Sequence, residues 1–77
     1  MREKDRERFV DLANKRVSKA LKSIQLIGNL SNRSNYDYTE EDVAKIVRAL
    51  QHEISGCRKR FDLALNKSNG KAQFFLE

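Results

Sequence analysis

The sequence predicts an all-α protein in which two long helices fold back on each other as an antiparallel hairpin. Three observations lead to this prediction. Apolar residues recur at helical spacing in two separate stretches, a polar segment at 29–39 lies between them, and the chain has no proline and only three glycines. With 77 residues, the chain forms one domain at most.

The first helix is predicted over residues 3–28, where apolar side chains line one face. Successive members of this line are three or four residues apart, which is the spacing of a heptad seam. The seam residues of this half are Val10, Ala13, Val17, Ala20, Ile24 and Ile27. Gly28 and Asn29 are suited to end the helix, because both residue types tolerate the left-handed backbone conformation.

The second helix is predicted over residues 40–65 and carries a seam of the same kind. Its seam residues are Val43, Val47, Leu50, Ile54, Cys57, Phe61 and Ala64. Thr39 is a candidate N-cap, and Asp42 completes a near match to a capping box, with Asp in place of the usual Glu or Gln. Gly56 costs about 1 kcal/mol of helix stability relative to Ala. Because it lies beside the seam, a close approach of another helix would account for it.

A two-helix hairpin leaves part of its apolar surface uncovered. Once the seams are paired, large apolar residues remain: Phe9, Leu12, Leu21, Leu26, Leu30 and Ile46. A chain of this length buries only about 60% of its extended-chain surface, so its core is marginal. We therefore expect two copies to form a homodimeric four-helix bundle, with docking on a larger protein as the alternative. The residues expected at the core or dimer contacts are Val10, Val17, Ile24, Ile27, Val43, Val47, Leu50, Ile54 and Phe61.

The hairpin accounts for residues 1–66, with the polar loop at 29–39, and a tail is predicted at 67–77. The tail begins with polar residues and a glycine and ends with Phe74, Phe75 and Leu76. Three large apolar side chains left in water would be unusual. Three outcomes are open: the tail packs on the helices or a second copy, it captures a partner, or it has no fixed structure.

Composition indicates the possible partners and the cellular compartment of the protein. The net charge of +5 permits binding to nucleic acid or another anionic surface without demonstrating it. The single cysteine, Cys57, excludes an internal disulfide and favours a reducing, cytoplasmic compartment. No apolar run approaches the roughly 18 residues of a membrane span, and the charged N-terminus leads into no signal-peptide core. We therefore expect no membrane association.

The chain offers little for catalysis. Its one histidine, His52, and its one cysteine, Cys57, are five residues apart in the second helix. They project about 140° apart and cannot readily share a proton or a ligand. The seam position of Cys57 predicts a buried thiol. The sequence contains no catalytic triad, phosphate loop or paired carboxylates, so we expect no enzyme, no cofactor, no metal and no small-molecule substrate.

A basic stripe on the first helix is one candidate binding surface. Residues 12–36 contain no acid, and Lys15, Lys19 and Lys22 share one face of the helix, with Arg16 beside them. Such a stripe would bind phosphates without sequence preference. A solvated helix face is the simpler interpretation, and we favour it.

The loop is the second candidate binding surface. Tyr and Arg are favoured at binding hot spots, and Asn supplies adaptable hydrogen bonds. The loop residues that combine these properties are Asn32, Arg33, Asn35, Tyr36 and Tyr38. A turn between helices has the same composition, because Asn and Ser satisfy the backbone groups of turns. We therefore treat the loop as a turn first and as a contact surface second.

These observations predict a small non-catalytic interaction module that self-associates and acts as an adaptor or inhibitor by docking on a partner protein. The alternative is a small basic nucleic-acid-binding regulator that uses the stripe on the first helix. A third interpretation is a chain that fills a groove in a larger assembly.

Overall fold

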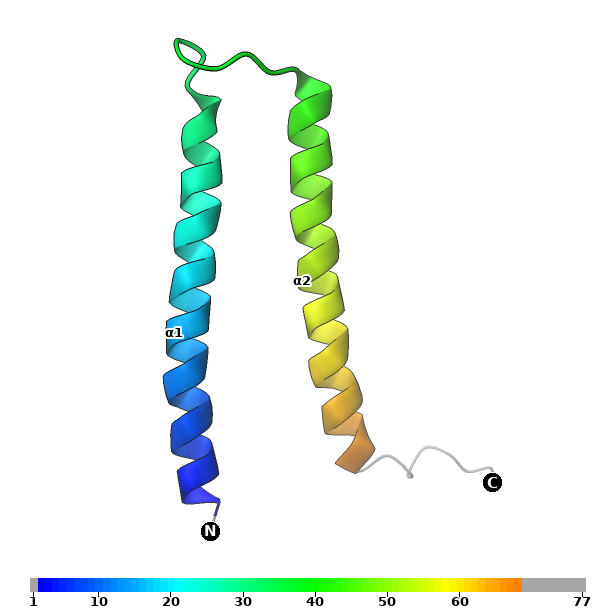
Figure 1. Ribbon diagram of the computed structural model, residues 1–77. Coiled ribbons are helices and arrows are strands. Elements are labelled where there is room, and N and C mark those ends of the chain that lie inside the picture. Colours follow the sequence, from blue (N-terminus) through cyan, green and yellow to red (C-terminus); the bar gives the residue numbers. More distant parts are fainter. Residues whose placement is uncertain (1, 69–77) are drawn as a thin grey trace, which may run out of the picture. The chain divides into compact units, whose positions relative to one another are not determined.

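The computed structural model describes residues 2–68, with the backbone alone for residues 67 and 68. It contains helix α1 (Glu3–Gly28), a 3₁₀ turn η1 (Asn29–Ser31) and helix α2 (Glu40–Ser68), as Figure 1 shows. The chain divides into two units, residues 1–37 and 38–77, and each is described by itself. The all-α prediction with two helices is confirmed for the described residues, and the pairing of these helices stays a prediction.

The first turns of α1 are held by short-range contacts. Arg2 caps the helix with its backbone carbonyl, which accepts the N–H of Arg6 at 2.8 Å, and its side chain makes no capping hydrogen bond. The Arg8 guanidinium pairs with the Asp5 carboxylate at 3.1 Å. The Arg6 guanidinium lies 5.9 Å from the centre of the Phe9 ring, within cation–π range. These contacts keep the charged N-terminal segment helical.

Helix α1 ends at Gly28, as predicted, but the backbone conformation at this end differs from the expected one. Neither Gly28 (φ −60°, ψ −29°) nor Asn29 (φ −66°, ψ −17°) adopts the left-handed conformation. The helix tightens into η1 instead, and the chain leaves it at Asn32, whose backbone is extended at φ −69° and ψ 102°. The Asn32 side-chain oxygen accepts the N–H of Ser34 at 2.9 Å, which forms an Asx turn. A polar side chain therefore redirects the chain where a left-handed residue was expected.

The N-terminus of α2 carries the predicted capping box. The Asp42 N–H donates to the Thr39 hydroxyl at 3.1 Å, and the Thr39 N–H donates to the Asp42 carboxylate at 2.9 Å. The Val43 N–H also donates to the Thr39 carbonyl at 3.2 Å. The prediction is confirmed with Asp in the place of Glu or Gln, and the acidic first turn stabilises the positive end of the helix.

The later part of α2 departs from the prediction in two ways. The helix continues through Asn66 to Ser68, beyond the predicted end at residue 65, so residues 67 and 68 belong to α2 and not to a tail. The predicted apolar end at Phe74, Phe75 and Leu76 lies outside the described residues. Gly56 has an ordinary helical backbone, and a β-carbon there would meet nothing within 4 Å. Helix α2 by itself therefore gives no reason for a glycine at this position.

Neither helix buries a side chain within the described part of the chain. Every side chain of residues 2–66 is exposed or half-buried. Most of the stability of helices in proteins comes from packing an amphipathic face, because isolated helices are marginal in water. The exposed apolar faces of the helices therefore indicate association with a partner or with another copy.

Candidate functional site

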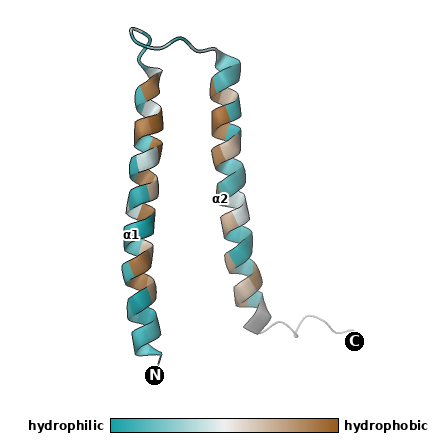
Figure 2. Cartoon of the chain, in the orientation of Figure 1, coloured by the Kyte–Doolittle hydropathy of each residue, from teal (hydrophilic) through white to brown (hydrophobic). Residues whose placement is uncertain are grey.

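The predicted seam forms an exposed apolar face along each helix. Figure 2 shows apolar residues recurring along α1 and α2 between polar ones. Val17 of α1 is 54% exposed, and Ile54 and Phe61 of α2 are 62% and 52% exposed. Ile27 and Leu50 are half-buried, and the other predicted seam residues are exposed as well, namely Val10, Ile24, Val43 and Val47. Each Å² of apolar surface covered by a partner would contribute about 25 cal/mol, so these faces are strong candidates for an interface.

On each helix, further apolar residues lie beside the seam on one flank of that helix. The seam contains residues spaced by seven, namely Val10, Val17 and Ile24 in α1 and Val47, Ile54 and Phe61 in α2. Each apolar residue beside the seam lies one residue before or two residues after one of these. We call these residues the side surface of each helix: Phe9, Leu12 and Leu26 on α1, and Ile46, Ala49, Gly56 and Leu63 on α2. The same flank also carries the charged residues Arg16 and Lys19 on α1 and Glu53 and Arg60 on α2. Leu26 is 54% exposed and Leu63 is 69% exposed. The sequence reasoning missed Leu63, although its seven-residue spacing from Gly56 was a usable signal.

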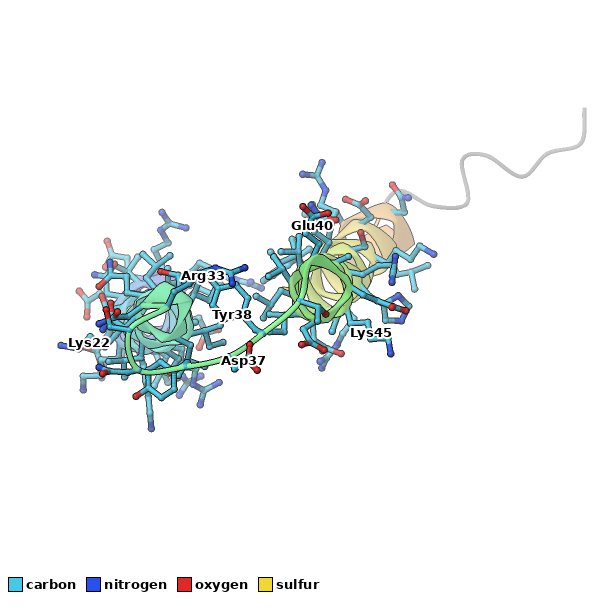
Figure 3. All side chains as sticks on the ribbon, turned by 90° about the horizontal axis from the view of Figure 1, so that it is seen from above. Lys22, Arg33, Asp37, Tyr38, Glu40 and Lys45 are labelled. Atoms are coloured by element: carbon cyan, nitrogen blue, oxygen red, sulfur yellow. The ribbon has the colours of Figure 1, made fainter. Side chains whose placement is uncertain are left out.

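The other flank of each helix carries an ion pair and one exposed leucine, Leu21 on α1 and Leu65 on α2. Lys15 pairs with Asp11 at 3.3 Å on α1, and Arg58 pairs with Asp62 at 3.1 Å on α2. Both aspartates directly follow a seam residue, so they lie on the flank away from the side surface. Exposed pairs at this spacing contribute no more than about 0.5 kcal/mol. Figure 3 shows side chains projecting around the whole circumference of each helix.

The predicted basic stripe is only partly a single surface. Lys15, Lys19 and Lys22 project within about 60° of one another on α1, whereas Arg16 projects at least about 60° from that arc. Lys15 also has an acidic partner, since Asp11 lies one turn before Lys15 and immediately before the acid-free stretch. The four basic residues therefore do not form one uniform face, although all of them are exposed.

Most of the predicted loop residues lie in one tight turn. The Asn32 carbonyl accepts the N–H of Asn35 at 3.1 Å and of Tyr36 at 3.0 Å, and the turn brings Arg33 into the same short segment. Tyr36 is 48% exposed. Tyr38 is half-buried and belongs to the second unit, directly before the capping residue of α2. The structure thus brings together four of the five predicted residues, and it gives the turn interpretation a hydrogen-bonded basis.

The two residues considered for catalysis, His52 and Cys57, both lie on α2. His52 and Cys57 are both exposed on α2, so the buried thiol predicted for Cys57 is not found in the single chain. The structure shows no group of three or more potential metal ligands within residues 2–68. Over that same range neither helix has an apolar stretch that could cross a membrane.

Comparison with known proteins adds no relative. No protein-family model, no curated protein and no solved structure matches this chain. The proposals below therefore depend on the helices and their surfaces.

Proposed function

We propose that this chain is a small, non-catalytic, cytoplasmic interaction module. Its two helices pair as an antiparallel hairpin, two hairpins form a four-helix bundle, and the assembly acts as an adaptor or inhibitor by docking on a partner protein through the loop. The observation that carries this proposal is the exposure of a long apolar face on each helix, with no buried side chain among residues 2–66.

The seam residues support antiparallel pairing of α1 with α2. One register sets seam residues of α1 against apolar residues of α2 along most of the helix. It pairs Val10 with Cys57, Ala13 with Ile54, Val17 with Leu50, Ala20 with Val47 and Ile24 with Val43. The two alanines of α1 each meet a β-branched residue, so large side chains face small ones, as dense packing requires. The same register places the loop at the turn between the helices.

Charges beside the seam support the same register. It brings Glu7 across from Arg58 and Arg16 across from Glu53, and both pairs have opposite charges. Antiparallel pairing of α2 with α2 of another copy would instead set Glu53 against Glu53. Charges at these positions select the partner helix and its direction. Pairing of α1 with α2 is therefore the favoured arrangement.

A charge exchange tests this pairing. Arg16→Glu and Glu53→Arg should each lower the free energy of unfolding by about 0.5 kcal/mol, because each sets like charges beside the seam. The double variant should recover most of the loss, as measured by urea unfolding followed by circular dichroism. Additive losses in the double variant would contradict the register.

The loop is the part of the proposal that concerns a partner protein. Replacing Arg33, Tyr36 and Tyr38 together with alanine should abolish binding of a partner while leaving the helical content unchanged. A matched control replaces Ser18, Gln25 and Ser55, which lie on the flank with the ion pairs, with alanine. Partner binding that survives the loop substitution would show that the loop is not the docking surface.

Nucleic-acid binding is the second candidate function. It is favoured by the acid-free stretch 12–36 and by the exposed Lys19 and Lys22. Titration against DNA and RNA at several salt concentrations tests it, because phosphate binding by a lysine stripe weakens steeply as salt rises. Lys19→Glu with Lys22→Glu should abolish such binding, and Lys45→Glu on α2 is the control. Absence of binding at low salt would eliminate this function.

A further inference from the structure

We draw no further inference here: the strongest candidate, the exposed side surface of α2 around Ala49, Gly56 and Leu63, carries nothing, because nothing among the described residues shows what covers it.

Discussion

Replacement of Ile54 by alanine distinguishes a covered seam from a solvent-exposed helix face. Ile54 is 62% exposed in the single chain, so the chain itself removes only a little more than a third of this side chain from water. Full burial of an isoleucine contributes about 1.5–3 kcal/mol, and covering the remaining part should therefore contribute about 1–2 kcal/mol per chain. We expect Ile54→Ala to lower the free energy of unfolding by about this amount.

His52→Ala is the matched control, because His52 is exposed on the outer side of the same helix, two residues earlier. Alanine is the best helix former, so both substitutions would raise helical content if the helix were free in solution. Urea unfolding followed by circular dichroism at a fixed protein concentration measures the difference. We expect Ile54→Ala to be destabilising and His52→Ala to be neutral or slightly stabilising. Equal stabilisation by both would refute the assignment of Ile54 to a covered seam.

Three further predictions concern the helix cap, the cysteine and a surface ion pair. Thr39→Ala should lower the free energy of unfolding by about 1 kcal/mol, because it removes the hydroxyl that accepts the Asp42 N–H. Thr39→Ser keeps the hydroxyl and should retain most of this stability. Equal urea midpoints for the two variants would count against the cap. Cys57 is exposed in the single chain, but the proposed seam pairing sets it against Val10. Its reaction with an aromatic disulfide reagent should therefore be about tenfold slower in the associated protein than in urea. An equal rate would mean that the seam is open. Asp62→Asn should change the free energy of unfolding by no more than about 0.5 kcal/mol, because the ion pair of Asp62 with Arg58 is exposed. A clearly larger loss in urea unfolding would show that the flank of α2 with this ion pair is covered.

Much of the secondary structure could be predicted from residue spacing and local chemistry. The seam spacing indicated both helices, and the Thr39–Asp42 pair indicated where α2 begins, because a capping box depends only on residues close in sequence. The end of α1 at Gly28 was predicted as well, but the conformation of the chain that follows it was not. Residue type suggested Gly28 and Asn29, but the side chain of Asn32 redirects the chain, and this depends on a turn conformation that sequence does not specify. The continuation of α2 through Asn66 shows that one polar residue does not end a helix.

The candidate surfaces were predictable only in part. Periodicity identifies which residues share a helix face, so the seam was recognisable from the sequence. It does not show whether that face is covered, and Cys57 is exposed in the single chain although its seam position predicted burial. Counting apolar residues revealed a surplus, but not the ion pairs of Asp11 and Asp62, which depend on side-chain conformations.

The most direct test of the account is the mass of the protein in solution across a dilution series, measured by light scattering, with helical content followed by circular dichroism on the same samples. The account predicts a species of twice the 9.0 kDa chain mass that dissociates on dilution with loss of helical signal, because the helices are stabilised by association. A constant mass of one chain with undiminished helical content at every concentration would contradict it.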